Sequence, residues 1–577
     1  MKNIVLCSDG TGNKGGYGAD SNVYKTYKAV DIKNPGVDQY TFYDQGVGTD
    51  KSDTSKNKYR TALSGAFGFG FRDNVLHLYH FLARSYNPGD AIFLFGFSRG
   101  AATVRAFAGF INACGLIDIS KHAVKPNGDF DSDRCERLVS HAFDCYKSKD
   151  KNLMQKFKDQ YAIKDDIHAP NGDLKIKFVG VWDTVSALGF SQDFSFLLKW
   201  IFSAADKISN MIPWLAHDFY DYDLNNSIEN AYHALSIDDE RTTFHPKVWD
   251  EKVVWDEKKL NRIPFNGYVE QVWFAGVHSN VGGGYPRTGL SDVALQWMLT
   301  KAQAHGLVLY PDQITAIQDS ANIYDRLYDS RDGVAIYYRY GPRNLVELCD
   351  KKLNGNIAIH LSAYKKLKEL SDGYAPDGIP RNFDIIDINP TNPASATIVR
   401  QVNTVDPTWA GLETEMNKVI EKRKYVYRIF VELTMAIIVA SGLFWVCPPE
   451  SVMELNACEK KHVQIVQTTS PQTNELSSLI ANPFFAFEQD VNSKPNSDTS
   501  PDFCKKANNR PLKWLADITR YLTPVYFENF ITYVFEVHWW IFIVMLSTLF
   551  YLNSIHKRCV NRLDKVCRDM TDLLPKL

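Results

Sequence analysis

One serine of this chain stands where it could act as a nucleophile. The apolar run from Ala91 to Phe97 has strand length, and it leads through the sequence Gly-Phe-Ser-Arg-Gly, centred on Ser98, into residues that favour a helix. A Gly-x-Ser-x-Gly sequence between a strand and a helix is typical of a nucleophile elbow, where the serine lies at a sharp, strained turn. Glycines on either side let the strand and the helix approach closely. The pattern predicts that Ser98 attacks an ester or similar carbonyl group.

Two later residues have the types and positions that such a serine needs as partners. Residues 176–181 have strand character and lead to Asp183, and the apolar run 269–277 leads to His278 on a glycine-rich loop. Each feature alone has a simpler explanation, because an aspartate after a strand often caps a helix and one histidine among 14 is usually structural. The order serine, aspartate, histidine, each after an apolar strand, is that of the α/β-hydrolases. We therefore expect a triad in which His278 is the general base and Asp183 orients it.

The start of the chain could serve the same site. Residues 4–7 form a short apolar run, and the loop after it contains Gly10 and Thr11. In a doubly wound sheet, the loops at the carboxyl ends of the strands share one crevice. The backbone N–H groups of Gly10, Thr11 and Arg99 are thus candidates for an oxyanion hole. A plain turn explains the loop equally well, whereas the aspartyl phosphatase motif Asp-x-Asp-Gly-Thr fails because Cys7 occupies the position of the nucleophilic aspartate.

Two further features could bind a phosphate group. A glycine-rich run lies at residues 65–70, but no clear strand, loop and helix surround it as in known phosphate-binding loops. The side chains of Arg99 and Arg105, next to the expected elbow, could bind the phosphate of a lipid. For Arg105, helix packing or a structural ion pair is the simpler role.

The composition excludes several other classes of function. The chain has 577 residues, with 65 Lys and Arg against 67 Asp and Glu, and its formal net charge of -2 offers no field for binding nucleic acid. Its ten cysteines lack metal-ligand spacing, and we expect most of them to be buried thiols. A serine triad needs no metal and no organic cofactor. The first apolar run is too short for a signal peptide, so we expect the N-terminal part to stay in the cytoplasm.

Alternating strand and helix signals predict an α/β fold of the hydrolase type, with a mostly parallel sheet flanked by helices. Besides the strands named above, residues 40–44 have strand character. Residues 76–86 and 135–161 have helical spacing, and we expect another short helix at 227–236. These elements would place the three candidate catalytic residues at one edge of the sheet.

We expect the hydrolase domain to span residues 1–405. Within it, an insertion at about 188–232 contains the apolar segment 194–215, which has two tryptophans and few charges. This segment predicts a helical cap packed over the sheet. It could also act as a lid or interfacial helix that admits lipid, and the two roles are compatible.

With these features together, the sequence resembles the α/β-hydrolase family of type VI secretion phospholipase effectors, most of whose members are uncharacterised. The resemblance covers about residues 1–310 and implies that Ser98, Asp183 and His278 form the triad and that the substrate is a lipid acyl ester. Gly12 departs from the family, where many members carry tryptophan, and the C-terminal third does not match. The matching blocks are residues 7–13, 46–49, 88–90, 96–101, 180–185, 233–235, 239–241 and 272–285.

The C-terminal third contains two apolar runs, 429–447 and 537–555. Each has about 19 residues, enough to cross a hydrocarbon core of about 30 Å as a helix. Basic residues before the first run and after the second predict that both flanks face the cytoplasm. Two buried core helices are the alternative. The expected arrangement is a hydrolase on the cytoplasmic side of the inner membrane, a basic linker at 406–428, an extracytoplasmic segment at 448–536 and a cytoplasmic tail at 556–577.

The extracytoplasmic segment would permit a disulfide. Cys458 and Cys504 lie within this segment and Cys447 lies just before it, where oxidation is possible. The sequence leaves the pairing among these three thiols open. Residues 467–500 are rich in Ser, Thr, Asn and Pro, a composition typical of a mobile segment.

Together these features predict a membrane-anchored serine hydrolase that cleaves acyl esters of lipids, as a phospholipase or lipase. The bilayer itself would supply the substrate. Two alternatives are an anchored esterase or thioesterase that acts on soluble substrates, and a catalytically inactive membrane protein for signalling or assembly. Fluorophosphonate labelling of Ser98 separates the inactive protein from the two enzymes.

Overall fold

The computed structural model describes most of the chain and divides it into two compact units. The first unit comprises Met1–Phe194, Phe202–Tyr425 and Cys559–Leu577, and the second comprises Ser195–Ile201 and Val426–Arg558. The described residues are 1–46, 70–186, 222–256, 261–369, 371–453, 456, 512–523 and 527–576.

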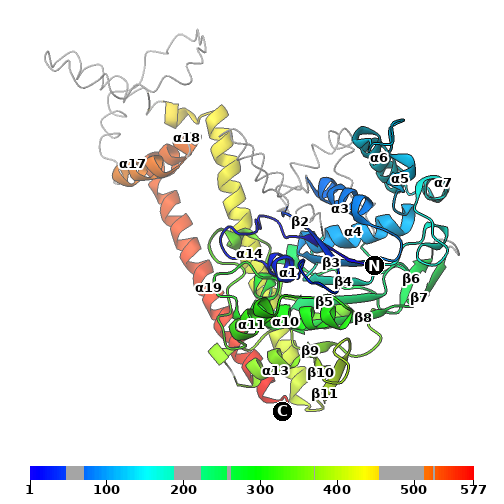
Figure 1. Cartoon of the computed structure of the whole chain (residues 1–577). Helices are drawn as coiled ribbons and strands as arrows, with labels where there is room; N and C mark the ends of the chain where they lie inside the picture. Colours follow the sequence, from blue (N-terminus) through cyan, green and yellow to red (C-terminus); the bar gives the residue numbers. More distant parts are fainter. Residues whose placement is uncertain are drawn as a thin grey trace, which may run out of the picture. The chain divides into compact units, whose positions relative to one another are not determined.

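A single large sheet forms the centre of the first unit (Figure 1). Within the described residues, nine strands pair in the order β11-β10-β9-β8-β5-β4-β3-β1-β2, and all neighbours are parallel except β10 and β11. The loops that follow β1, β3, β4, β5 and β8 therefore share one edge of the sheet. The strands are β1 (Asn3–Ser8), β2 (Gln39–Asp44), β3 (Ala91–Phe97), β4 (Phe178–Trp182), β5 (Asn230–Ser236), β8 (Tyr268–Phe274), β9 (Ala358–His360), β10 (Asn382–Ile388) and β11 (Ala396–Asn403).

Helices cover both faces of this sheet, so the central strands are apolar on both sides. On β1, Ile4 and Leu6 belong to the core cluster of one face, and Val5 and Cys7 belong to that of the other. The predicted α/β fold, with a mostly parallel sheet flanked by helices, is therefore present. The first face is covered by α3 (Phe71–Ser85), α4 (Arg99–Cys114), α6 (Ser132–Ser148) and α7 (Lys151–Tyr161), and the second by α1 (Asn22–Ala29), α10 (Gly289–Ala304) and α11 (Pro311–Ser320).

Most predicted elements occur where the sequence places them. The apolar runs become β1, β3, β4 and β8, and the segments 40–44 and 76–86 lie in β2 and α3. The predicted helical region 135–161 is divided into α6 and α7. The division occurs because Lys149 adopts a left-handed conformation, with φ at 55°, and Asp150 then caps α7.

The short helix predicted at 227–236 is wrong, because residues 230–236 form β5. Alanine and leucine in this segment favour a helix in isolation. The segment nevertheless lies between β4 and β8, and its residues from Ala231 to Ser236 are all buried. Pairing with two neighbours and burial of both faces outweigh the local preference. The predicted insertion at about 188–232 therefore ends before β5, and residues 188–221 of it lie outside the described residues.

Two long helices dominate the C-terminal third. These are α14 (Thr408–Val446) with 39 residues and α19 (Trp539–Asp572) with 34 residues. By length and composition each could cross a membrane, although two such helices alone are weak evidence of a membrane protein. The predicted linker at 406–428 lies mostly within α14, and the predicted tail at 556–577 lies mostly within α19.

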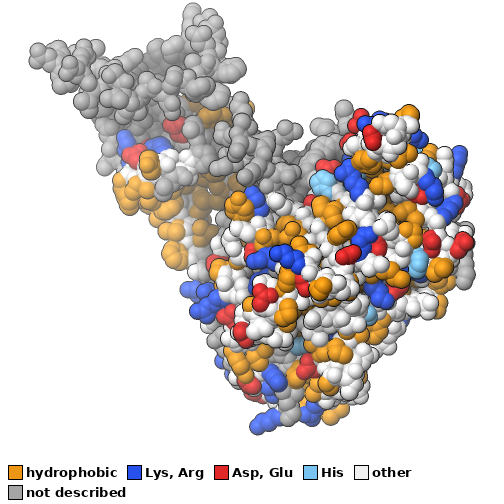
Figure 2. Space-filling view, in the orientation of Figure 1, with side chains coloured by type: hydrophobic (Ala, Val, Ile, Leu, Met, Phe, Trp, Pro, Cys, Tyr) orange, Lys and Arg blue, Asp and Glu red, His pale blue; other side chains and the backbone are white. Residues whose placement is uncertain are grey.

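The second unit also contains shorter helices next to α19. Within the described residues, α17 (Lys513–Leu522), α18 (Glu528–Ile531) and a π-helix, η8 (Thr532–Val537), share a small apolar cluster. Hydrophobic side chains are exposed over α17 and α19 (Figure 2). Among them are Trp514, Tyr521, Trp540, Val544 and Phe550.

Candidate active site

Ser98 lies at the turn between β3 and α4. Its φ of 57° and ψ of −122° are a strained conformation for a residue with a side chain. The flanking glycines are required by space: a Cβ atom on Gly96 would lie 2.6 Å from the carbonyl oxygen of Gly100, and one on Gly100 would lie 2.1 Å from that of Ser8. The strand, the strained turn and the helix predicted around Ser98 are thus all present.

Asp183 and His278 are in direct contact. Asp183 follows β4, and His278 is the first residue of α9 (His278–Gly282). The Nδ1 atom of His278 lies 2.5 Å from the Oδ2 atom of Asp183, and both residues are buried. This contact orients the imidazole ring through one of its two nitrogens. The other nitrogen, Nε2, is buried without a hydrogen-bond partner among the described residues, so it can accept a proton.

Ser98 lies beside this pair. Its backbone N–H donates to the carbonyl oxygen of Trp182, the residue before Asp183, at 3.1 Å. The ring of Phe97, the residue before Ser98, packs on the His278 ring with 4.6 Å between the centroids. The described part of the chain contains no hydrogen bond from the Ser98 hydroxyl to Nε2 of His278, and such contacts are often long in enzymes without substrate. The three predicted residues thus lie at one edge of the sheet, after β3, β4 and β8.

The His278 ring is enclosed by aromatic side chains. Phe97 covers one side, and Phe244 meets the ring edge-on with 5.0 Å between the centroids. Burial lowers the pKa of His278, and the hydrogen bond and charge of Asp183 offset only part of this effect. A neutral imidazole with an open Nε2 atom is the form that a general base needs.

A buried carboxylate shapes the loop after β1. Asp9 accepts hydrogen bonds from the hydroxyl groups of Ser21 at 2.5 Å and Tyr43 at 2.7 Å, and from the backbone N–H of Gly10 at 2.7 Å. The Gly10 N–H is therefore already engaged. This geometry does not support the prediction that Gly10 is an oxyanion donor.

The other two predicted oxyanion residues are Thr11, in the loop after β1, and Arg99, directly after Ser98. The loop approaches the elbow closely, because a Cβ atom on Gly10 would lie 3.1 Å from the Cβ atom of Ser98. Thr11 is the next residue, and its hydroxyl oxygen is buried without a hydrogen-bond partner in the part of the chain that is described. Arg99 is the first residue of α4, where N–H groups have no acceptor within the helix itself. The oxyanion role of Thr11 and Arg99 stays a prediction.

The features predicted to bind phosphate have different outcomes. Arg105 is buried and donates to the carbonyl oxygens of Tyr222 and Lys247, both at 2.6 Å, so it has the packing role. Burial lowers the pKa of Arg99 to about 10, which leaves its side chain positive at neutral pH. Several other predicted features lie outside the described residues, namely residues 47–49, 65–69 and 194–215, Cys458 and Cys504.

Comparison with known proteins assigns the N-terminal half of the chain to a family. Residues 2–301, just over half of the chain, match the family model described as T6SS, Phospholipase effector Tle1-like, catalytic domain. The chain belongs to this Tle1-like family. The matched residues include Ser98, Asp183 and His278, and they end within α10.

Individual relatives of this Tle1-like domain are distant. Uncharacterized protein YEL023C of Saccharomyces cerevisiae (strain ATCC 204508 / S288c) is 25% identical over 262 residues, which are 42% of this chain and 32% of the yeast protein. The match thus spans about a third of the yeast protein. A crystal structure of an uncharacterized protein from Pseudomonas aeruginosa has a TM-score of 0.32 and 16% identity over 75% of this chain and 59% of that one. The structure of the Tle1 effector bound to the VgrG spike from the type 6 secretion system has a TM-score of 0.30 and 13% identity over 69% of this chain and 88% of that one.

One residue of the site comes from beyond the matched Tle1-like domain. Arg343 lies between η5 (Gly333–Tyr337) and α12 (Leu345–Cys349) and donates to Oδ1 and Oδ2 of Asp183 at 2.7 and 2.8 Å. Burial by itself raises the pKa of Asp183, but the charge and hydrogen bonds of Arg343, together with His278, hold this pKa well below its usual range. Arg343 was not predicted from the sequence, because no local pattern indicates a partner 160 residues away.

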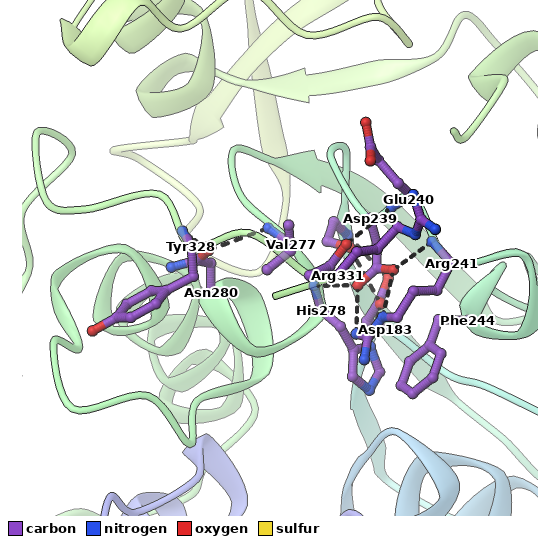
Figure 3. Close-up of polar contacts among 12 residues, drawn as sticks. Asp183, Asp239, Glu240, Arg241, Phe244, Val277, His278, Asn280, Tyr328 and Arg331 are labelled. Atoms are coloured by element: carbon purple, nitrogen blue, oxygen red, sulfur yellow. Dashed lines mark hydrogen bonds and ion pairs between the residues drawn. The ribbon is translucent and has the colours of Figure 1, made fainter. Parts of the chain in front are cut away.

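Asp239 holds His278 from a second side (Figure 3). Its buried carboxylate accepts a hydrogen bond from the backbone N–H of His278 at 3.1 Å and pairs with Arg241 at 2.7 Å. The Arg241 guanidinium in turn lies over the Phe244 ring, 3.5 Å from its centroid. Asp239 and Phe244 therefore contact His278 directly, and Arg241 holds both of them in place. Residues 239–241 belong to a block of the family resemblance, but no role could be predicted for them.

Glu240, the next residue, binds helix α14. Its two carboxylate oxygens accept hydrogen bonds from Nη1 and Nη2 of Arg423 at 2.7 and 3.0 Å, and Nη1 also donates to the Tyr340 hydroxyl at 3.0 Å. Both partners of this ion pair belong to the first unit. The loop that holds His278 thus also holds, through Arg423, the part of α14 that belongs to the first unit.

Proposed function

We propose that this chain is a membrane-anchored serine hydrolase that cleaves acyl esters of lipids, as a phospholipase or lipase. The observation that carries the proposal is the buried Asp183–His278 contact beside a serine at a strained strand-to-helix turn. Membership of the Tle1-like phospholipase effector family supports a lipid ester as the substrate. The exposed apolar helices α14 and α19 support attachment to the bilayer that would supply it.

In the proposed reaction, the Ser98 hydroxyl attacks the ester carbonyl while Nε2 of His278 takes its proton. Asp183 stabilises the imidazolium that forms. Backbone N–H groups at Arg99 and Thr11 would stabilise the negative oxygen of the tetrahedral intermediate, each donor being worth about 10²–10³ in rate. His278 then gives the proton to the leaving alcohol, and a water molecule releases the fatty acid from Ser98 in the same way. No metal and no organic cofactor takes part in this scheme.

For the membrane arrangement, we propose that α14 and α19 each cross the inner membrane once, with the hydrolase unit on the cytoplasmic side. Each helix has a long apolar stretch, and basic residues lie before the first stretch and after the second. A fusion of alkaline phosphatase, which is active only outside the cytoplasm, tests this arrangement. Activity is expected for a fusion within residues 457–511 and not for a fusion after the C-terminus; the reverse pattern, or no activity in either, contradicts it.

The catalytic proposal is tested by labelling the full-length protein with a fluorophosphonate, which reacts with activated serines. Labelling of the wild-type protein is expected to disappear in Ser98→Ala. The matched control is Ser291→Ala, which removes another buried serine hydroxyl, one that donates to the carbonyl oxygen of Thr288. Wild-type protein that does not react would favour the inactive signalling or assembly protein.

Substrate class is tested with the same variants. Lipid mass spectrometry of cells that express the wild-type protein is expected to show free fatty acids and lysolipids that are missing with Ser98→Ala. Hydrolysis of short-chain nitrophenyl esters without any lipid change would instead identify an esterase that acts on soluble substrates.

A further inference from the structure

We propose that Arg343 is a positioning residue of this site, which keeps the Asp183 carboxylate ionised and turned toward His278, while its own positive charge helps to keep the imidazole neutral in mildly acidic conditions. The proposal rests on the serine-hydrolase function proposed above. Arg343 lies outside residues 2–301, so the site would be completed by a segment that the family model does not include.

The contacts of Arg343 fix several parts of the site at once. Its Nη1 atom donates to Oδ1 of Asp183 and to the hydroxyl of Ser236, at 2.7 and 2.6 Å. Its Nη2 atom donates to Oδ2 of Asp183 and to the carbonyl oxygen of Phe244, at 2.8 and 2.5 Å. Phe244 is also the residue whose ring packs against His278. One guanidinium group therefore sets the positions of the carboxylate and of an aromatic wall of the histidine.

The pair is wholly buried, since the side chains of Arg343 and Asp183 are both 0% exposed. A buried carboxylate without a cation tends to take up a proton, because removal of its charge from water is costly. The bidentate guanidinium prevents this and leaves one oxygen, Oδ2, shared with Nδ1 of His278. Lysine could supply the charge but not the planar pair of hydrogen bonds.

Charged and titratable groups surround the histidine from several elements. Asp183 comes from the end of β4, Asp239 and Arg241 follow β5, and Arg343 precedes α12. The buried His233 of β5 lies near Asp183, which tends to raise the pKa of His233, but burial outweighs this and lowers that pKa to about 3, so His233 stays neutral. Arg343 is thus the cation that binds the triad carboxylate directly, whereas Arg241 binds Asp239.

Loss of the Arg343 cation is expected to shift the pH–rate profile in one direction, for two reasons. Without it, the field of Asp183 acts undiminished on His278 and favours the imidazolium, which cannot accept the serine proton. Without it, burial also raises the pKa of Asp183 itself, and a protonated Asp183 cannot stabilise the imidazolium. Both effects move the acid limb of the pH–rate profile to higher pH. Loss of a merely structural contact lowers the amount of folded protein without moving this limb.

The test measures the rate constant of fluorophosphonate labelling between pH 4.5 and 9 for full-length wild-type protein, Arg343→Gln and Arg343→Lys. For Arg343→Gln we expect the midpoint of the acid limb to rise by about one pH unit or more, which lowers the rate below the midpoint about tenfold. Arg343→Lys keeps the positive charge, so its midpoint is expected to stay near that of the wild type while its maximal rate falls. Arg105→Gln is the matched control, because it removes another buried arginine and is expected to lower thermal stability without moving the midpoint.

Each outcome has a distinct meaning. If the wild-type protein labels and Arg343→Gln has the same midpoint, the role of Arg343 is overturned and the hydrolase proposal stands. If the wild-type protein does not label, both proposals fall. If Arg343→Gln does not fold, Arg343→Lys decides: slower labelling at an unchanged midpoint supports the proposal, and a wild-type rate or a midpoint raised by a unit overturns it.

Discussion

Two buried carboxylates follow strands of the same sheet, and their partners differ in charge. Asp9, after β1, is held by uncharged groups: the hydroxyls of Ser21 and Tyr43, the side-chain amide of Asn13 and the backbone N–H of Gly10. Asp183, after β4, is held by the guanidinium of Arg343 and by His278.

The two environments shift the pKa values in opposite directions. Burial raises the pKa of Asp9, and its four hydrogen bonds offset only part of that effect. Burial also raises the pKa of Asp183, but Arg343 and His278 reverse the balance and hold this pKa well below its usual range. Asp9 therefore serves as a hydrogen-bond centre that shapes a loop, whereas Asp183 is kept as an anion, which is the form that a triad needs.

The largest expected effect is that of Asp183→Asn. The labelling rate is expected to fall about 10³–10⁴-fold, because the amide can neither stabilise the imidazolium nor hold the correct tautomer. The fold is expected to lose about 3–5 kcal/mol, because the buried Arg343 loses its counter-charge. Labelling kinetics and chemical denaturation measure the two effects. A variant that labels within tenfold of the wild type would remove Asp183 from the triad.

The next effect concerns the contact between the Asp9 loop and the elbow. In Gly100→Ala, the new Cβ atom would lie 2.1 Å from the carbonyl oxygen of Ser8 and 2.5 Å from that of Asp9. We expect a loss of about 1–3 kcal/mol or more and a severe loss of labelling, because the loop or the helix must move. Gly12→Ala is the control, since nothing lies within 4 Å of its Cβ position and only its φ of +76° opposes the change. Equal stability of the two variants would show that the close approach is absent.

Asp9→Asn makes at the first carboxylate the same chemical change that Asp183→Asn makes at the second. We expect it to keep most of the labelling rate, since the amide oxygen can still accept from Gly10 and the two hydroxyls can reorient. Asp9→Ala, which leaves those donors without an acceptor, is expected to cost about 1–3 kcal/mol.

Asp9 and Asp183 are also expected to change the pH dependence of stability in opposite directions. Because the pKa of Asp9 is raised in the folded state, its contribution to stability declines as pH rises from the ordinary value of about 3.9 through the folded value. The stability of Asp9→Asn relative to the wild type is therefore expected to increase with pH. The lowered pKa of Asp183 means that its contribution is present above that ordinary value and is lost as pH falls, so Asp183→Asn loses most near neutral pH. Thermal unfolding midpoints from pH 4 to 7 measure both slopes, and slopes of equal sign would contradict the contrast.

The smallest expected effect is that of Asp238→Asn. Burial raises the pKa of Asp238 to about 6, despite hydrogen bonds from the Gly276 N–H at 2.6 Å and the Tyr374 hydroxyl at 2.9 Å. Wild-type stability should therefore decline slightly as pH rises through about 6, and this decline should be absent in the variant. Unfolding midpoints at pH 5 and pH 7 provide the measurement. An unchanged slope would mean that Asp238 titrates as an ordinary surface carboxylate.

The parts of the fold and of the site that depend on local sequence could be predicted, and the parts that depend on distant contacts could not. Local sequence predicts the elbow around Ser98 and the strands that lead to Asp183 and His278, because each follows an apolar run that ends in glycine or polar residues. Strand β5 could not be predicted, because its alanines and leucine become a strand only between two neighbours.

The partners of the site depend on contacts between distant segments, which a local pattern does not show. Arg343 meets Asp183 across 160 residues, and its own surroundings contain no pattern that singles it out. The amide of Gly10 fitted the pattern of an oxyanion donor, but it is taken by the carboxylate of the preceding residue. The sequence of a loop shows which residues have hydrogen-bond donors, but it does not show which acceptors these donors bind.

The ion pair between Glu240 and Arg423 has a mechanical consequence. Asp239 carries the hydrogen bond to the His278 backbone, and its neighbour Glu240 carries the helix α14, so the two attachments are one residue apart. Their Cα atoms are about 3.8 Å apart, and the peptide plane between them is stiff. A pull or tilt of the helix at Arg423 would therefore pass from Glu240 to Asp239, and so to the His278 backbone, with only one peptide unit between the two attachments.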